Sequence, residues 1–181
     1  QGRINNAIAA AGAAGGSSVE HRPGAGVLSA RIIIDQDNVH LAGSGWGTVI
    51  SGTVGVNEGY IQIDSTSEAR ENVTIADLWL ARDDDSGGGF STGVIYGNDT
   101  NEINDLTIAG VKITDTGAAG QNLITFRNEA GSMHRLWIHH CHLQHQDRYG
   151  IQLHKKVIVG WVENNYIELT AAGLNTIAVY D

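Results

Sequence analysis

The chain has 181 residues, 41% of them hydrophobic, which is enough for a single domain with a continuous core. Its formal net charge of −9 argues against nucleic acid and anionic membranes as partners, because both attract basic surfaces. The 24 glycines against one proline favour tight turns between short strands over a helical bundle.

The N-terminal segment predicts a short amphipathic helix. Ile4, Ile8 and Ala11 lie on one helical face, and the glycines of residues 12–16 end the pattern. Such a helix can cover the open end of a repeat protein, as terminal repeats must. The apolar segments Arg31–Ile34 and Val39–Ile50 follow and are expected to form the first coil.

Four later segments share one internal spacing, which indicates a repeat. They are NVTIADLWL, DLTIAGVKI, RLWIHHCHL and GWVENNYIEL, and each has two apolar residues five positions apart, as in a strand, a bend and a strand. The alternation of side chains along strands predicts an inward ladder of Leu78, Val111, Cys141 and Asn165. The outward neighbours are Trp79, Lys112, His142 and Tyr166.

A second series alternates inward and outward residues: Ile61-Gln62-Ile63, Val94-Ile95-Tyr96, Ile124-Thr125-Phe126, Ile151-Gln152-Leu153 and Ile177-Ala178-Val179. Its period shortens from 33 residues, between Ile61 and Val94, to 26, between Ile151 and Ile177. These periods predict an all-β fold, a right-handed parallel β-helix of about five coils with a capping helix. Residues 1–181 then form a single β-helix domain, which we expect more coils or a partner to continue.

Stacking of coils about 4.8 Å apart makes residues distant in sequence neighbours. Three outward rows are expected in the second series. One is Asp64, Gly97, Arg127, His154 and Tyr180; the next is Gly59, Thr92, Asn122, Tyr149 and Asn175; the middle row is Gln62, Ile95, Thr125, Gln152 and Ala178.

Three segments resemble the pectate-lyase-like superfamily of β-helix proteins, which includes polysaccharide lyases, uronan epimerases, glycoside hydrolases and phage tailspikes. AIAAAGAAGG with VHLAGSGWGTVI resembles the cap and first coil of alginate epimerase modules and many tailspikes, and VENNYIEL resembles a later pectate lyase coil. RLWIHHCHL resembles the pectate lyase segment Trp-Ile-Asp-His-Cys, with His139 at the acidic position. YGIQLH resembles the epimerase motif Tyr-Gly-Phe-Asp-Pro-His, with Gln152 in place of the catalytic aspartate. The resemblance implies carbohydrate chemistry on this fold.

A lyase or epimerase acting on a uronic acid must neutralise the carboxylate, remove a proton and return one. Arg127 is expected to pair with the carboxylate, His154 to act as the base, and Tyr149 or Tyr180 to supply the proton. The residues expected to bind substrate are Asn122, Gln152, His142, Lys112 and Tyr166. A solvated polar face remains the alternative interpretation of these rows.

No metal site is predicted from the histidines. Their run is His134, His139, His140, His142 and His145, with Cys141 among them, and strand alternation sends neighbouring members to opposite faces. The carboxylates of Asp83, Asp84 and Asp85 could hold calcium, although consecutive acidic residues in a glycine-rich loop are commonly just solvated. No other cofactor is expected.

These observations predict an extracellular protein, secreted or on a virion or cell surface, that processes an acidic polysaccharide by lyase-type proton abstraction. The alternative is a glycan-binding or structural β-helix without turnover, such as a tailspike or surface filament segment. A polysaccharide is the expected partner. A homo-oligomer, as a trimer or an end-to-end stack, is compatible with both functions.

Overall fold

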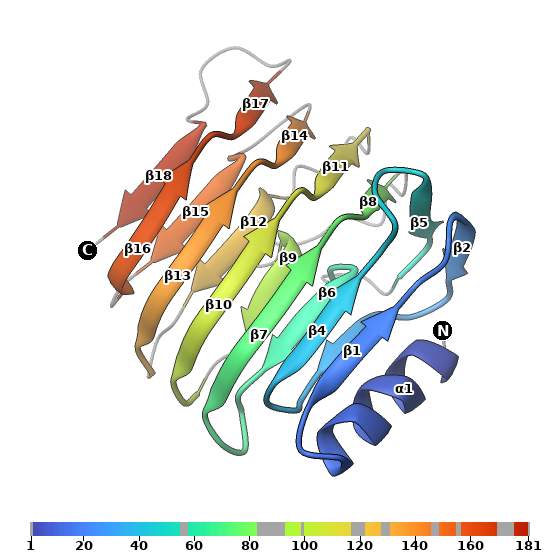
Figure 1. The fold of residues 1–181 in the computed structure, drawn as a ribbon. Helices are drawn as coiled ribbons and strands as arrows, with labels where there is room; N and C mark the ends of the chain where they lie inside the picture. The colour runs from blue at the N-terminus through green and yellow to red at the C-terminus, as the bar shows by residue number, and fades with distance from the viewer. Residues whose placement is uncertain are drawn as a thin grey trace.

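The computed structural model describes residues 2–54, 58–82, 93–98, 100–116, 122–127, 131–145, 149–154, 157–169 and 176–180, without the side chains of residues 98, 127, 145, 169 and 180. Across these residues the chain forms one short helix and a right-handed parallel β-helix, in which three strands make one coil (Figure 1). The predicted fold class is therefore confirmed.

The described strands form three parallel sheets of six strands each. Sheet A contains β1 (Ser17–Glu20), β4 (Val39–Ala42), β7 (Arg70–Ala76), β10 (Ile103–Ala109), β13 (Met133–His139) and β16 (Val157–Glu163). Sheet B contains β2 (Gly24–Leu28), β5 (Thr48–Gly52), β8 (Trp79–Arg82), β11 (Lys112–Asp115), β14 (His142–His145) and β17 (Tyr166–Leu169). Sheet C contains β3 (Ile32–Ile34), β6 (Ile61–Asp64), β9 (Gly93–Asn98), β12 (Asn122–Arg127), β15 (Ile151–His154) and β18 (Ile177–Tyr180).

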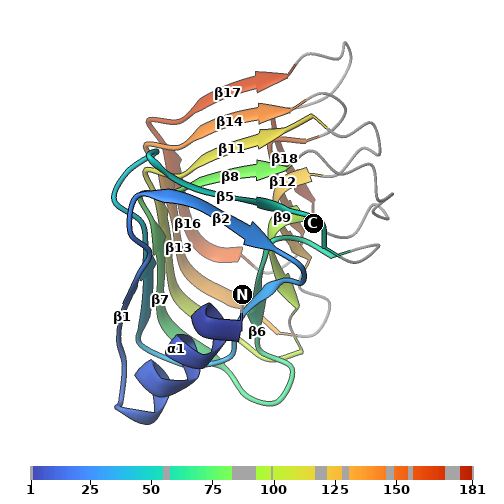
Figure 2. The same cartoon turned by 90° about the vertical axis from the view of Figure 1, so that its right-hand side faces the viewer.

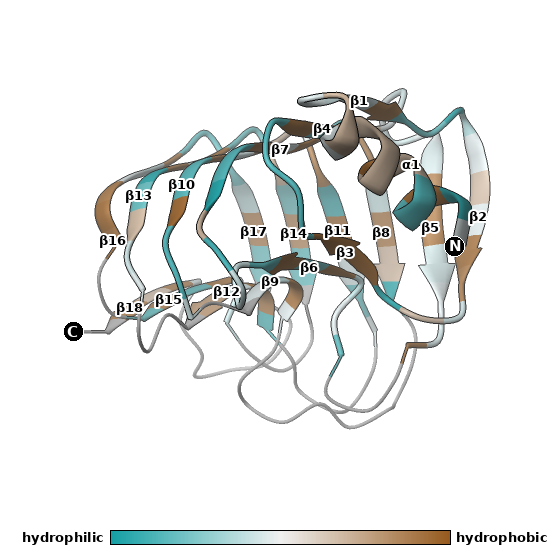
Figure 3. Cartoon of the chain, turned by 90° about the horizontal axis from the view of Figure 1, so that it is seen from below, coloured by the Kyte–Doolittle hydropathy of each residue, from teal (hydrophilic) through white to brown (hydrophobic). Residues whose placement is uncertain are grey.

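The core lies between the three sheets and is filled by the inward-facing side chains, which alternate with outward-facing ones along each strand. Ile75, Ile108 and Ile138 pair in register along sheet A, and all three are fully buried. Figure 3 shows hydrophobic and hydrophilic residues alternating along several strands. Because each inward residue stacks on its counterpart in the next coil, burial of apolar surface continues through the first five coils. In the sixth coil the corresponding residues Ile177 and Val179 are 41% and 68% exposed.

The bend from sheet A to sheet B has the same backbone form in four coils. Asp77, Gly110, His140 and Asn164 occupy it with φ values of 52°, 62°, 55° and 54°. This left-handed conformation suits glycine and is tolerated by Asp, Asn and His. It turns the following residue into the core, so Leu78, Val111 and Cys141 are buried, as the inward ladder predicted.

In the sixth coil a polar residue takes this inward position. The Asn165 side chain donates a hydrogen bond to the carbonyl of Ile138 (2.9 Å) and accepts one from the amide of Cys141 (2.9 Å). The amide thus bonds to the bend of the neighbouring coil, where the earlier coils place an apolar side chain.

We expect Asn165→Ala to lower the free energy of unfolding by about 1–3 kcal/mol, because it leaves two backbone groups without these partners. Asn164→Gly is the matched control, since glycine adopts positive φ readily. Chemical denaturation measures both variants. An Asn165→Ala protein as stable as the parent would contradict this role.

The helix α1 (Gly2–Ala13) covers the first coil, as predicted, with Ile8 and Ala11 buried. It ends in a Schellman motif, in which the Gly16 amide donates to Ala11 and the Gly15 amide to Gly12, both at 2.9 Å. Among the described residues, no helix has the length and apolar character needed to cross a membrane.

The helix also satisfies the outer edge of sheet C. The Asn5 side chain accepts a hydrogen bond from the Ile33 amide (3.1 Å) and donates one to the Arg31 carbonyl (3.4 Å). Ile33 lies in β3, and no strand of the described residues pairs with β3 on that side. These bonds replace the partners that a preceding strand would supply.

The described residues form six coils, one more than the approximate number expected. Residues 17–28 contribute β1 and β2, so β3 closes the first coil and Val39–Ile50 begins the second. The expected register of sheet C is wrong by one residue in β9, because Ile61 pairs with Ile95 and not with Val94. Tyr96, and not Ile95, therefore occupies the middle outward row.

Candidate functional site

The end of sheet C carries the three stacked residues that the sequence predicted. In the backbone register Arg127 pairs with His154, and His154 pairs with Tyr180. This pairing confirms that the three positions follow one another on adjacent strands. The side chain of His154 is half-buried, and those of Arg127 and Tyr180 lie outside the described residues.

Two strands earlier, in β6 and β9, this row differs from the predicted one. Asp64 pairs with Asn98, so Asn98 stands where Gly97 was expected. The Asp64 carboxylate accepts hydrogen bonds from the amide (3.0 Å) and the hydroxyl (2.7 Å) of Thr66. Asp64 thereby stabilises the turn that leaves β6.

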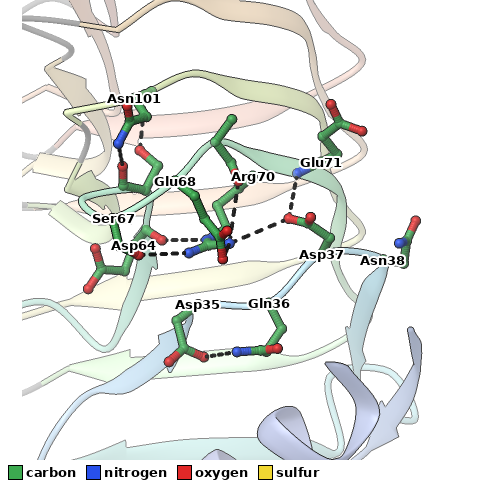
Figure 4. A network of polar contacts seen from close by, with 12 residues as sticks. Asp35, Gln36, Asp37, Asn38, Asp64, Ser67, Glu68, Arg70, Glu71 and Asn101 are labelled. Carbon is green, nitrogen blue, oxygen red and sulfur yellow. Dashed lines mark hydrogen bonds and ion pairs between the residues drawn. The ribbon is translucent and has the colours of Figure 1, made fainter. Parts of the chain in front are cut away.

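Arg70 stabilises this turn from an inward-facing position at the start of β7. It pairs with Ile103 in register and is 2% exposed. Its Nε donates to the Asp64 carbonyl (2.6 Å), and its Nη1 contacts the carboxylates of Glu68 (3.0 Å) and Asp37 (3.7 Å) (Figure 4). One guanidinium group thus joins the loop between β3 and β4, the end of β6 and the start of β7.

Arg70→Ala should lower the free energy of unfolding by about 3 kcal/mol, because it removes a buried charge that several acceptors share. Arg135→Ala is the control, since the ion pair of Arg135 with Asp105 lies on an exposed surface, where such pairs contribute little. Thermal unfolding should separate the two variants clearly. Equal effects of the two substitutions would contradict an anchoring role for Arg70.

Tyr149 lies at the entry to β15, where the predicted substrate-binding residue Asn122 bonds to its backbone and a second one, Gln152, bonds to Asn122. Asn122 donates from Nδ2 to Oε1 of Gln152, and its Oδ1 accepts from the Tyr149 amide (3.4 Å). Asn122 is 1% exposed and Gln152 is 7% exposed. In this arrangement Asn122 positions the backbone of Tyr149, and Gln152 holds Asn122.

The middle outward row of sheet C is polar but buried. Gln62, Tyr96 and Thr125 are each at most 6% exposed. The Tyr96 hydroxyl donates to Gln62 (2.9 Å) and accepts from Arg31 (3.1 Å), which forms an ion pair with Glu58 (3.3 Å). Burial raises the pKa of Tyr96 above its usual value, although the Arg31 guanidinium acts in the opposite direction, so the phenol stays protonated at neutral pH.

The outer face of sheet B carries the other predicted ladder, and its register is confirmed. Trp79, Lys112, His142 and Tyr166 pair in that order on adjacent strands. The Lys112 Nζ lies 4.0 Å from the centre of the Trp79 ring, and the rings of His142 and Tyr166 are 4.8 Å apart. Trp46 joins them from the loop between β4 and β5, with its ring 5.6 Å from that of His142. We call these five residues the sheet B strip.

The structure separates the two sets of predicted site residues. Arg127, His154 and Tyr180 lie on sheet C, with Tyr149 just before β15, whereas Lys112, His142 and Tyr166 lie on sheet B. Figure 2 shows the strands of the two sheets forming different sides of the coil. A ligand bound on one of these sheets therefore meets a different group of side chains from a ligand on the other.

Sheet A carries two exposed tryptophans. Trp137 pairs with Trp161, and the indole nitrogen of Trp137 donates to the Glu163 carboxylate (3.0 Å). The Trp137 ring also lies 4.3 Å from the ring of His139.

The described side chains of the histidine run do not converge on one point. His139 ends β13, His140 lies in the bend at 2.8 Å from His139 (Nδ1 to Nδ1), and His142 begins β14 on the outer face of sheet B. Within the described ranges, no three His, Cys, Asp or Glu side chains are grouped as a metal site would require. Asp83, Asp84 and Asp85, considered for calcium, lie outside the described residues.

Cys141 is a core residue of the bend, 2% exposed. Burial raises the pKa of its thiol to about 11, so the reactive thiolate is scarce at neutral pH. Because the raised pKa favours the protonated form in the folded state, the thiol contributes stability below pH 9.0 that is lost as the pH approaches 11.

We therefore expect iodoacetamide to modify Cys141 very slowly in the folded protein at pH 8 and rapidly in denaturant. Mass spectrometry of the intact chain measures the modification. Similar rates in both conditions would show that the thiol is accessible.

Sequence reasoning did not identify two residues of these surfaces, Trp46 and Tyr96. Trp46 stands in the turn GSGWG, where an aromatic residue among glycines and serine could have indicated a surface role. Tyr96 was displaced by the register error. A glycine two residues before the first inward residue of both strands, Gly59 before Ile61 and Gly93 before Ile95, could have corrected it. The structure explains this glycine, because a Cβ at Gly59 would collide with the Gly93 carbonyl oxygen.

The fold is similar to that of a solved structure from Parabacteroides merdae, which is provisionally described as a glycosyl hydrolase. The TM-score is 0.53, and the match covers 98% of this chain and 86% of that chain at 14% sequence identity. At this identity the likeness shows the fold alone. No protein-family model matches the chain, and no curated protein sequence matches it significantly. The chain is thus a right-handed parallel β-helix protein by its structure.

Proposed function

We propose that the chain is an extracellular polysaccharide-processing protein of lyase type that acts on an acidic glycan at the end of sheet C. The observation that carries this proposal is the register that stacks Arg127, His154 and Tyr180 on three adjacent strands. The resemblance of RLWIHHCHL and YGIQLH to pectate-lyase-like proteins supports it. The similar fold of a protein described as a glycosyl hydrolase agrees with carbohydrate as the substrate class.

In the proposed reaction each group has one task. Arg127 pairs with the uronate carboxylate and stabilises the negative charge that develops when the adjacent C–H bond breaks. His154 takes that proton, and the electron pair forms a carbon–carbon double bond as the glycosidic C–O bond breaks. Tyr149 or Tyr180 gives a proton to the leaving oxygen. Asn122 holds the backbone of Tyr149, and Gln152 holds Asn122.

His154→Ala should reduce the rate of product formation on polygalacturonate or alginate by about 10²- to 10⁴-fold, the range for loss of a positioned base. The ultraviolet absorbance of the unsaturated uronate product measures the rate. His40→Ala is the matched control, because His40 is an exposed histidine on sheet A. If His154→Ala folds normally, as circular dichroism can show, and keeps the parental rate, the assignment of His154 fails.

A second candidate function is glycan binding or a structural role without turnover, as in a tailspike or surface filament segment. The burial of Gln62, Tyr96 and Thr125 favours it, because the centre of sheet C is closed to a substrate chain. The absence of unsaturated product from every uronan tried, together with a trimer in solution, would support this candidate over the lyase.

A further inference from the structure

The sheet B strip is a surface that the proposed reaction does not use. It extends from β8 to β17, with Trp46 added from the loop between β4 and β5. Trp46 is 45% exposed and Tyr166 is 57% exposed, so large aromatic faces are accessible on the outside of the coil. Large aromatic groups with free faces are the usual elements of binding surfaces.

The two indoles of the strip are fixed in place. The Trp46 nitrogen donates to the carbonyl of Gly110 (2.8 Å), and the Trp79 nitrogen donates to the Thr114 hydroxyl (2.9 Å). The Trp46 loop is further tied down where the Gly45 amide donates to the Asp77 carbonyl (2.9 Å). Figure 2 shows this loop beside the starts of β8 and β11. Since the polar atom of each indole is already bonded, what remains for a ligand is the ring face, held without further loss of entropy.

The positive charge of the sheet B strip is that of Lys112, and it favours a ligand with a negative group at that position. The Lys112 ammonium is flanked by the rings of Trp79, at 4.0 Å, and Trp46, at 5.7 Å. The next outward position on each strand holds the neutral side chains of Thr114 and Gln144, and a carboxylate, Glu168, occurs in the last coil. A carboxylate on the ligand can therefore approach Lys112 from the solvent side.

The spacing of the strip fits a linear chain of sugar rings. Its four members on strands, Trp79, Lys112, His142 and Tyr166, repeat once per coil, about every 4.8 Å along the stack. This distance is similar to the length of one pyranose unit in an extended polysaccharide. Each sugar ring has an apolar face of C–H groups, which packs on an aromatic ring, and a rim of hydroxyl groups, which hydrogen-bonds to polar neighbours.

We propose that the sheet B strip binds an anionic polysaccharide lengthwise, with sugar rings on Trp46 and Tyr166 and a carboxylate at Lys112. The choice of an acidic glycan rests on the proposed function, whereas the surface itself is separate from the sheet C row. The strip retains the polymer and takes no part in breaking it.

Binding of polygalacturonate and of alginate, followed by affinity electrophoresis and by tryptophan fluorescence, tests the proposal. We expect Trp46→Ala and Tyr166→Ala each to weaken binding roughly three- to tenfold. Lys112→Gln should remove the preference for these polyuronates over neutral cello-oligosaccharides and reduce the salt dependence of binding. Trp137→Ala is the matched control, because Trp137 is 42% exposed on sheet A and should leave binding unchanged.

Parental affinity in Trp46→Ala, Tyr166→Ala and Lys112→Gln would overturn the proposal, as would the absence of binding by the parent protein. If Trp46→Ala does not fold, Tyr166→Ala decides, because the exposed Tyr166 ring can be removed with little effect on the core. Affinity electrophoresis and tryptophan fluorescence measure binding and not turnover. Weak binding by the strip variants with full activity of His154→Ala would therefore refute the sheet C site and leave the sheet B strip standing.

Discussion

The structure depends on one constraint, the parallel hydrogen bonding that places each residue of a coil over its counterpart in the next. The side chain at an inward position must then be apolar or fully hydrogen-bonded in every coil, because burying a polar group without a hydrogen-bond partner is unfavourable. Leu78, Val111 and Cys141 meet this requirement with apolar side chains, and Asn165 meets it with two hydrogen bonds to the neighbouring bend. The same constraint makes the outer rows continuous, so isolated surface residues become strips.

The sequence predicts the fold and the sheet B ladder well because the bend between sheets A and B has the same length in the last four coils. With no insertion in these coils, apolar residues five positions apart define both strands and their faces. Sheet C is harder, because the segments that precede it vary in length and the sequence Val94-Ile95-Tyr96 has three consecutive apolar residues that permit two registers. The strands at residues 17–28 were missed since they are short and largely exposed.

Strand alternation likewise predicts one part of the candidate sites and not the other. Pairing of Arg127, His154 and Tyr180 could be predicted because β12, β15 and β18 share a clear alternation. What alternation cannot predict is the burial of an outward row: Gln152 and Asn122 face outward and yet bond to each other under cover. Strand alternation also does not predict long-range contacts. The Trp46 ring, for example, contacts His142, which lies in β14, three strands beyond β5 in sheet B. Such contacts depend on loop conformation, which periodicity does not encode.

The capping helix has a consequence for self-association. A stack of parallel strands is open at its ends to templated growth, in which each added chain copies the hydrogen-bonding pattern of the last, as in amyloid fibrils. The Asn5 side chain binds the Ile33 amide of β3 and the carbonyl of the preceding residue, Arg31, so an incoming strand would have to displace the helix to pair with this edge of sheet C. Templated addition of a strand to this part of the stack therefore requires the helix to move first.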